Sequence, residues 1–538
     1  MATRRPNILF IMSDDHASHA ISCYTGADAS PPRPAINKTP NIDRIANEGM
    51  RFDNCFCTNS ICTPSRAVIL TGKHSHNPLN GVKTFLPMDN ELPNVAKDLQ
   101  AAGYQTAIFG KWHLGLGPRH CPKGFDEWKV LPGQGEYFDP EMHVNDPAVP
   151  GGRVVKAKGY TTDIITRDTL DFLARRDKAR PFFVMCHHKA PHRPWLADEA
   201  HWNAFKDAVV PLPASFTDDY SSSKARANAC MRIEKDFDCE DVDVLPPAGT
   251  GWKVRLAPPP RIEDYMLEPF DRFDEDAETE GVRFSSLEAR KQWLYQRYMR
   301  KYLAVVASVD DSVGQLLAYL DKEGLAEDTI VMYTSDQGFF LGDHGWYDKR
   351  FMYEESLRMP FLLRYPRAVR PGTTSKALVL NLDFAPTWLD YAGVPIPKEM
   401  QGTTFREILE SGGQAPPGWR TSMYYRYWME ADGAHNTTAH YGIRTVGPGR
   451  PAMKLIYYYA DGMGIPDTNQ FGKMVDVAER DKYKHVREWE CFDLDKDPYE
   501  MRNIYKDPAR AAEIKALKGE LHRLQAECGD VPYPEEEP

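Results

Sequence analysis

A chain of 538 residues, of which 42% are hydrophobic and 27% charged, is long enough for one large hydrophobic core and a smaller domain. Its formal net charge of −11 argues against nucleic acid as the main partner, although a small anionic substrate is compatible with it if cations are concentrated at one site. No run approaches the roughly 18 consecutive apolar residues typical of a membrane span, so no membrane partner is predicted.

The N-terminal segment MATRRPNILFIMSDD has basic residues before an apolar stretch, as a signal peptide does. Its apolar part is only about six residues long, shorter than the usual h-region of roughly 7–15 residues, and it runs directly into Asp14 and Asp15. We interpret this segment as a strand of the mature fold. On that interpretation we predict a cytoplasmic protein.

Four short apolar runs recur along the chain, and each ends in polar, ionisable residues. They are NILFIM before Ser13-Asp14-Asp15, QTAIFG before Lys111-Trp112-His113, PFFVMC before residues 187–192, and TIVMYT before Ser335-Asp336-Gln337. Such runs are typical of buried strands in a mainly parallel sheet, and helical segments lie between them. Because ligands bind beyond the carboxyl ends of the strands in α/β sheets, we expect the four ends to meet in one crevice.

The composition and hydrophobic pattern of the chain change three times after residue 205. Residues 206–283 are polar and Pro-rich, which predicts an insertion of loops and short helices. A long helix is expected from about residue 286 to 323, either continuous or broken once. After about residue 412, short β-like runs and a final amphipathic helix indicate a small α+β domain. We therefore predict an α/β fold with a large parallel sheet between helices over residues 1–412, and a C-terminal α+β subdomain with an antiparallel sheet over residues 413–538.

Ten scattered cysteines fit reduced, mostly structural thiols better than a disulfide framework. Cys55, Cys57 and Cys62 lie close together in CFCTNSIC, but this spacing matches no familiar zinc motif. Cys62 precedes Pro64 and an apolar, helix-compatible run. From this pattern alone Cys62 is a buried thiol, a metal ligand or the precursor of another group.

The acidic strand ends favour a metal ion. Asp14 and Asp15 at one end, and Asp336 and Gln337 at another, are hard oxygen ligands, and unpaired buried carboxylates are costly without a cation between them. Such ligands favour Ca²⁺, with Mg²⁺ or Mn²⁺ as alternatives. For either pair alone, capping of a helix or a turn is an equally good interpretation.

Cations and histidines accompany these carboxylates. Lys111 and His113 stand two apart, so both side chains leave an extended segment on the same side. With Arg66 and Lys349 they suit a tetrahedral oxyanion such as a phosphate or sulfate ester. His192 lies between two prolines that restrict its backbone, which would position a proton donor. Three further histidines are interpreted as structural hydrogen-bonding groups: His187, His188 and His344.

The segments CTPSR and LTGK (residues 62–73) resemble the C-x-P-x-R…TG signature of type I sulfatases, in the alkaline-phosphatase-like superfamily. The resemblance continues in PNILFIMSDD, GKWHLG, APHRPW, TSDQGFFLGDHGWYDK and CFDLDKDPYEMRNIY, in the family's order. It is nearest to carbohydrate sulfatases of the N-acetylglucosamine-6-sulfatase and iduronate-sulfatase kind. In this family the signature cysteine is oxidised to Cα-formylglycine by a formylglycine-generating enzyme.

The resemblance implies that Asp14, Asp15, Asp336 and Gln337 bind the metal together with the modified Cys62. In relatives the second strand-end pair is often Asp-Asn or Asp-His, so Gln337 is a variant that keeps an oxygen ligand.

The resemblance also implies roles for the cations. Arg66, Lys111 and His113 would hold the formylglycine and the sulfate, and His192 and Lys349 would contact the ester oxygen and assist departure of the alcohol. A hydrated aldehyde offers two hydroxyls: one attacks sulfur, and deprotonation of the other, by His113, expels sulfate. The expected activity is hydrolysis of a sulfate monoester of a sugar, with aryl sulfates as artificial substrates.

Two other functions remain open at this point. A phosphonate monoester or phosphodiester hydrolase of the same superfamily can also carry formylglycine, and its substrates likewise present one negative charge at a tetrahedral centre. A protein that binds sulfated glycans without cleaving them belongs to a different class, in which Cys62 would stay unconverted.

Overall fold

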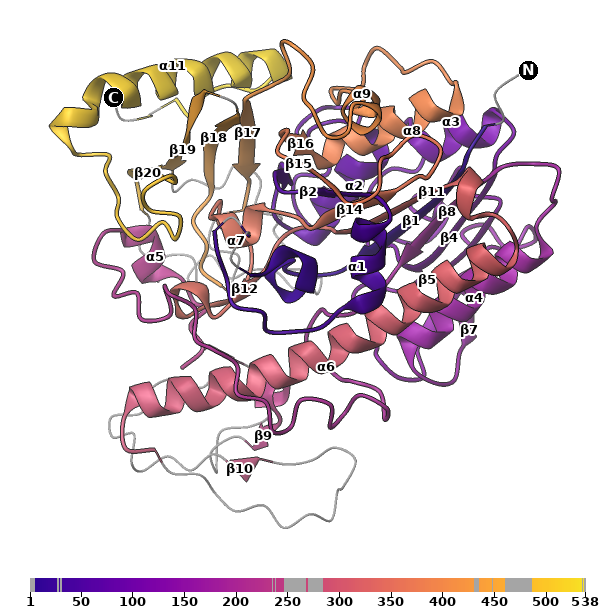
Figure 1. The fold of residues 1–538 in the computed structure, drawn as a ribbon, viewed down its shortest axis with the longest axis horizontal. Helices are drawn as coiled ribbons and strands as arrows, with labels where there is room; N and C mark the ends of the chain where they lie inside the picture. Colours follow the sequence, from indigo (N-terminus) through magenta and orange to yellow (C-terminus); the bar gives the residue numbers. More distant parts are fainter. Residues whose placement is uncertain are drawn as a thin grey trace.

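The computed structural model in Figure 1 describes residues 5–26, 29, 31–234, 236–237, 239–245, 268–269, 284–429, 435–447, 449–459, 486–534 and 536. Its largest element is a ten-stranded sheet, which is mixed but parallel at its centre. In spatial order its strands are β15 (Thr373–Ser375), β2 (Met50–Phe52), β14 (Phe361–Arg364), β11 (Thr329–Ser335), β1 (Asn7–Ser13), β8 (Phe182–His187), β4 (Gln105–Lys111), β5 (Glu127–Leu131), β6 (Glu141–Val144) and β7 (Arg153–Lys156).

The four apolar runs predicted from the sequence are β1, β4, β8 and β11, and they lie side by side in the order β11-β1-β8-β4, all parallel. Every residue of these strands is buried, because helices cover both faces of the sheet. The N-terminal run is therefore the strand β1 at the centre of the fold, as expected.

Alternate residues of β1 point to opposite faces and contact two separate hydrophobic clusters. The helices α2 (Cys62–Thr71), α3 (Val95–Ala101) and α8 (Phe384–Ala392) cover one face. The helices α1 (Pro40–Asn47), α4 (Thr161–Arg175) and α6 (Leu287–Lys322) cover the other (Figure 1). The prediction of a large, mainly parallel sheet between helices is thus confirmed.

Helix α6 is a single element of 36 residues, without the break that the sequence left open. By length and composition it is the one helix among the described residues that is apolar enough to cross a membrane, but 67% of its most apolar stretch is buried. It packs against α4 and α1 beside the sheet. In this structure α6 is a core helix.

A second, antiparallel sheet follows in the chain, as predicted. Its strands are β17 (Ser422–Tyr427), β18 (His440–Gly447), β19 (Arg450–Tyr458) and β20 (Glu488–Asp493). The helix α11 (Ala511–Cys528) packs on one face, and the other face joins the cluster around α2, α3 and α8 (Figure 1). Strand β18 had no counterpart among the expected runs, because HYGIRTVG has few apolar residues.

Short elements complete the described fold. They are β3 (Cys55–Phe56), β16 (Val379–Leu380), β12 (Phe340–Leu341), β13 (Tyr347–Asp348), β9 (Val244–Leu245), β10 (Glu268–Pro269), α5 (Lys224–Asn228), α7 (Glu354–Leu357) and α9 (Arg406–Glu410). In the expected insertion, residues 206–234 form loops and the short α5, and most of the remainder lies outside the described residues. Within its described part, the insertion has the loops and short helix that were predicted.

Trp388 of α8 joins three strands of the central sheet. Its fully buried ring lies 5.0 Å from that of Phe10 and 5.3 Å from that of Phe183, and its indole N–H donates to the Met332 sulfur at 2.9 Å. We expect Trp388→Ala to lower the free energy of unfolding by about 3–5 kcal/mol, the usual cost of such a cavity. Denaturant unfolding measures it, with Trp202→Ala at a half-buried position as the control. A loss below about 1 kcal/mol would contradict this account of the core.

Candidate active site

The strand register brings the expected residues to one edge of the sheet. Ser13 of β1 pairs with Ser335 of β11, so Asp14 and Asp336, which follow them, leave neighbouring strands at the same level. On the other side of β1, the ends of β8 and β4 are aligned in the same way. The carboxyl ends of the four strands therefore meet at one edge of the sheet, as predicted.

Gly110 allows β4 to approach β8 just before Lys111. Its φ is 98°, a region that favours glycine, and a Cβ there would lie 1.9 Å from the His187 carbonyl oxygen. The glycine in FGKWH thus lets the chain turn so that Lys111 and His113 follow at the strand end.

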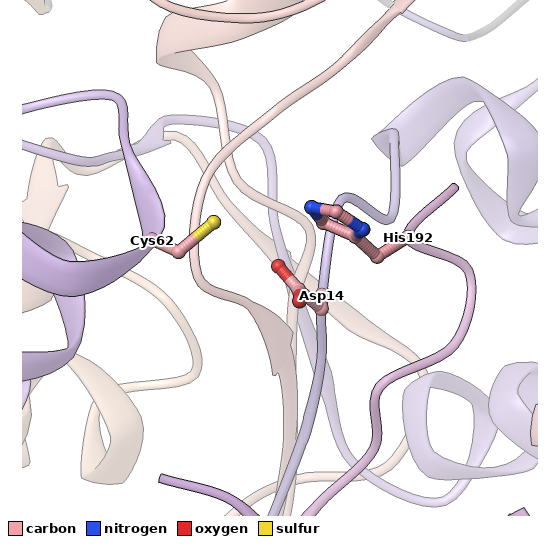
Figure 2. A group of neighbouring side chains, drawn as sticks. All are labelled: Asp14, Cys62 and His192. Atoms are coloured by element: carbon pink, nitrogen blue, oxygen red, sulfur yellow. The ribbon is translucent and has the colours of Figure 1, made fainter. Parts of the chain in front are cut away.

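Cys62 is the first residue of α2, and Pro64 lies in the first turn, where its missing N–H costs no hydrogen bond. Asn381 donates to the Ser65 hydroxyl at 2.9 Å, and that hydroxyl donates to the carbonyl oxygen of Asp336. These two hydrogen bonds therefore hold the start of α2 against the end of β11. Figure 2 shows the Cys62 sulfur facing Asp14 and His192, which come from separate segments.

Two groups of side chains have the geometry of a metal site. Ligand atoms of Asp14, Asp15 and Asp336 all lie within 4.8 Å of one another, as do those of Asp14, Cys62 and His192. The Oδ1 atom of Asp14 and the Oε1 atom of Gln337 are buried without a hydrogen-bond partner. Buried polar atoms are rarely left unsatisfied, so these two oxygens and the clustered carboxylates fit a hard divalent cation.

Three cations neutralise these carboxylates in pairs. Arg66 donates to Asp336 at 3.1 and 2.9 Å, and Lys349 pairs with Asp15 at 2.5 Å. Lys111, fully buried, pairs with Asp14. The sequence predicted that these cations gather at one site, and the structure brings them there.

Both predicted site histidines lie at this edge. His192 follows β8 in a loop whose Ala190 carbonyl accepts a hydrogen bond from the Asp14 N–H at 3.2 Å. The Nδ1 atom of His192 lies 2.9 Å from the Arg193 carbonyl oxygen, and its Nε2 atom lies 3.7 Å from Asp15. Burial and the neighbouring ammonium groups hold the pKa of both His113 and His192 well below the usual value, so both are neutral bases here.

Burial also decides the protonation of Cys62 and Asp15. It raises the pKa of the Cys62 thiol to about 12, so the unmodified side chain is a thiol and a poor nucleophile at neutral pH. Burial raises the pKa of Asp15 as well, to about 6, although Lys349 opposes the shift. The environment of position 62 therefore disfavours a thiolate.

The three histidines interpreted as structural make hydrogen bonds of that kind. His187 Nδ1 lies 3.2 Å from the Lys111 carbonyl oxygen, His188 Nε2 lies 3.1 Å from the Ser312 hydroxyl, and His344 Nδ1 lies 2.7 Å from Asp218.

Two residues that the sequence did not single out also lie at the site. Gln134, in the loop after β5, accepts a hydrogen bond from the Lys111 ammonium. Lys189, three residues before His192, is a buried cation in the loop that follows β8. A lone glutamine in a loop carries no signal, but a lysine between a strand end and a proline-flanked histidine could have been noticed.

The fold and this edge define a class of protein: an α/β protein of alkaline-phosphatase-like architecture, with carboxylates, cations and histidines gathered at the carboxyl ends of its central strands. A phosphonate monoester hydrolase from Agrobacterium radiobacter has this fold, with a TM-score of 0.64 over 97% of this chain and 96% of that one, at 19% identity. At that identity the likeness concerns the fold alone.

The chain belongs to the sulfatase family, whose model matches residues 6–394, and is thus a hydrolase of sulfate esters. A model described as the C-terminal part of N-sulphoglucosamine sulphohydrolase matches residues 342–469. Enzymes of the sulfatase family generally use a metal ion and formylglycine.

Similar proteins include an N-acetylglucosamine-6-O-sulfatase from Bacteroides thetaiotaomicron, 40% identical over 98% of this chain and 88% of that protein. The human N-acetylglucosamine-6-sulfatase is 28% identical over 80% of this chain and 68% of its own length. A structure solved in complex with its substrate D-glucosamine-2-N,6-O-disulfate covers 99% of this chain and 100% of that one, with 40% identity and a TM-score of 0.80.

Proposed function

We propose that this sulfatase removes the 6-O-sulfate from a glucosamine-type sugar, using a formylglycine made from Cys62 and a divalent metal ion. The proposal of the substrate is supported by the 40% identical N-acetylglucosamine-6-O-sulfatase and by the relative solved with a 6-O-sulfated glucosamine. The observation that carries the proposed chemistry is the meeting of Cys62, Asp14 and His192 within 4.8 Å at the end of the central strands (Figure 2).

Asp14, Asp15, Asp336, Gln337 and the modified Cys62 are the proposed metal ligands, with Ca²⁺ as the proposed ion. The unpartnered oxygens of Asp14 and Gln337 support this set, since each would gain a partner. When bound, the ion supplies positive charge that stabilises the oxygens gathered around it. The formylglycine, as a hydrated aldehyde, supplies one hydroxyl to attack sulfur and a second through which sulfate is released.

The remaining residues of the site would bind the sulfate and move protons. Arg66 and Lys349 carry positive charge at a buried edge of the sheet, where it stabilises an anionic sulfate ester more than in water. Lys111, whose pKa is lowered by burial, lies beside Asp14 at the same edge. The Nδ1–H of His192 donates to the Arg193 carbonyl oxygen, so Nε2, which faces Asp15, is the nitrogen that would contact the ester oxygen. In the neutral ring Nε2 carries no proton, so His192 would assist departure of the alcohol only after taking up a proton in the substrate complex.

His113 is the proposed base for sulfate release. Its φ of 56° turns the chain after Lys111, and its Nδ1 atom is buried without a hydrogen-bond partner. Because its pKa is lowered, it is neutral and able to accept a proton at neutral pH. This assignment follows the resemblance to type I sulfatases described above.

Hydrolysis of matched esters tests the substrate. We expect the purified protein to cleave N-acetylglucosamine-6-O-sulfate. Its kcat/KM on this substrate should be at least about a hundredfold higher than its kcat/KM on an isomer sulfated at O3 or O4, because placement of the reacting centre decides the rate. A phosphonate monoester and a phosphodiester of the same leaving group serve as controls. A phosphonate or diester that is cleaved faster by orders of magnitude would overturn the choice of sulfate.

Removal of the metal is expected to reduce turnover by at least about a hundredfold, because three buried carboxylates then lose their shared cation. Dialysis against a chelator followed by Ca²⁺, Mg²⁺ or Mn²⁺ measures this, and we expect Ca²⁺ to restore most activity. A second measurement does not depend on activity: Ca²⁺ should raise the Tm of the dialysed protein but not that of Asp14→Ala. Full activity and an unchanged Tm after dialysis would exclude the metal site.

Three further assignments extend this proposal. The maturation partner would be a formylglycine-generating enzyme, which recognises the segment around Cys62. The location would be the cytoplasm, and the domains would divide near residue 412, with residues 1–412 catalytic and residues 413–538 forming the C-terminal subdomain.

A further inference from the structure

Lys189 is a buried cation for which the mechanism above has no role. It lies in the loop between β8 and His192, with 3% of its surface exposed. Its ammonium donates to the Arg193 carbonyl oxygen at 3.3 Å and lies 4.8 Å from the centre of the Tyr137 ring. These contacts fix its position, but neither one offers a full negative charge.

The other three cations of the site each have a carboxylate. Arg66, Lys111 and Lys349 pair with Asp336, Asp14 and Asp15, respectively. Among the described residues no carboxylate oxygen comes within 4.0 Å of the Lys189 ammonium, and only one of its three N–H donors has a protein acceptor. Glu136 and Asp15 act on this ammonium only from beyond ion-pair distance. A buried ammonium without an anion in contact is costly, so this position fits an anion that a ligand supplies.

The ammonium of Lys189 lies beside His192. The Arg193 carbonyl that accepts from Lys189 also accepts from His192 Nδ1, whereas Nε2 faces Asp15. Figure 2 shows one ring nitrogen of His192 on the Cys62 side and the other turned away from it. Lys189 therefore lies on the Nδ1 side of His192, close enough to Asp15 and Cys62 for their charges to act on it. An anionic group bound beside the ester under attack would face this ammonium.

Tyr137 supports the same arrangement, since its hydroxyl donates to the His192 carbonyl oxygen while its ring lies beneath the Lys189 ammonium. The charge of Lys189 is felt across the site: it lowers the pKa of His113 and His192. Burial lowers the pKa of Lys189 itself to about 8, which leaves it mostly protonated at neutral pH.

We propose that Lys189 is a specificity-determining residue whose ammonium pairs with a second anionic group of the substrate, such as an N-sulfate beside the 6-O-sulfate. This inference rests on the proposed sugar-sulfatase function. It implies that the enzyme prefers a disulfated glucosamine to its N-acetylated, singly sulfated counterpart, because the second anion replaces the partner that the protein does not provide.

The test compares two substrates that differ in charge at one position: D-glucosamine-2-N,6-O-disulfate and N-acetylglucosamine-6-O-sulfate. For Lys189→Met, which keeps the length but removes the charge, we expect kcat/KM to fall about tenfold to a hundredfold on the disulfate, mostly through KM. On the N-acetyl substrate the change should stay within about threefold. Lys189→Arg should keep most of the preference, and Lys178→Met, at an exposed position, should change neither substrate.

Inhibition of aryl sulfate hydrolysis provides a second measurement. The inhibition constant of glucosamine-2-N-sulfate should rise about tenfold in Lys189→Met, while that of inorganic sulfate should stay the same. Equal losses on both substrates would overturn the inference and make Lys189 a positioning residue for His192, and so would an unchanged preference. A wild-type protein that cleaves neither sugar would instead contradict the proposed function, so the two failures are distinguishable.

Discussion

Cys62→Ala is expected to abolish hydrolysis of sulfate esters, by at least about 10⁴-fold, while the protein stays folded. The side chain at position 62 is the only proposed source of the attacking hydroxyl, and loss of a covalent nucleophile costs rates of this order. Removal of one small buried side chain at the start of α2 should lower the free energy of unfolding by only about 1 kcal/mol. Steady-state assay with an aryl sulfate and denaturant unfolding measure the two effects.

The matched control is Cys186→Ala, which removes another fully buried thiol, from β8. It should lose stability to a similar extent but retain turnover. The mass of the peptide containing residue 62 supplies the independent reading, since oxidation of cysteine to formylglycine replaces the sulfur by oxygen and removes two hydrogens. Active wild-type protein with an intact thiol in every molecule would refute the role given to this residue, and so would appreciable turnover by the alanine variant.

Lys111→Ala and His113→Ala are each expected to lower kcat/KM by at least about a hundredfold, the usual scale for a positioned acid–base or oxyanion-binding group. Lys111 lies in a fully buried pair with Asp14, and His113 follows it at the same strand end. The losses should appear in kcat as well as in KM, because both groups act on the charge that develops during sulfur transfer.

Stability has to be separated from catalysis in this experiment, because removal of Lys111 leaves Asp14 buried without its partner. Assays well below the Tm of each variant, with saturating Ca²⁺, keep the protein folded. Lys129→Ala is a suitable control, since Lys129 lies on the adjacent strand β5 but pairs with Asp168 outside the site. Near-normal activity of either Lys111→Ala or His113→Ala would remove that residue from the mechanism.

The central fold was predictable because its signal is local. Runs such as NILFIM and TIVMYT are apolar on both faces, and only a strand with helices on both sides of its sheet buries both faces. Strand β18 was missed for the opposite reason: HYGIRTVG is mixed in polarity, and its partners β17 and β19 decide that it pairs at all.

The sequence also predicted which residues form the site. Each follows a recognisable strand or motif: Asp14, Asp336, Lys111 and His192. The CTPSR motif identified Cys62 and, through family resemblance, its chemistry. These assignments depend on short segments whose residue types carry the information by themselves. Fold class and family could therefore be predicted before any coordinates.

Only the tertiary structure decided which charged side chains form ion pairs with one another. Which lysine pairs with which carboxylate depends on the register Ser13–Ser335 and on the close approach of β4 to β8 at Gly110, and both are long-range features. Only the structure shows that Lys189 is a buried ammonium with no carboxylate oxygen of the described residues within 4.0 Å. Nothing in the residues around it encodes that, because the partner of a charge is chosen by distances between segments far apart in the chain, and pairing energies rise steeply once water is excluded.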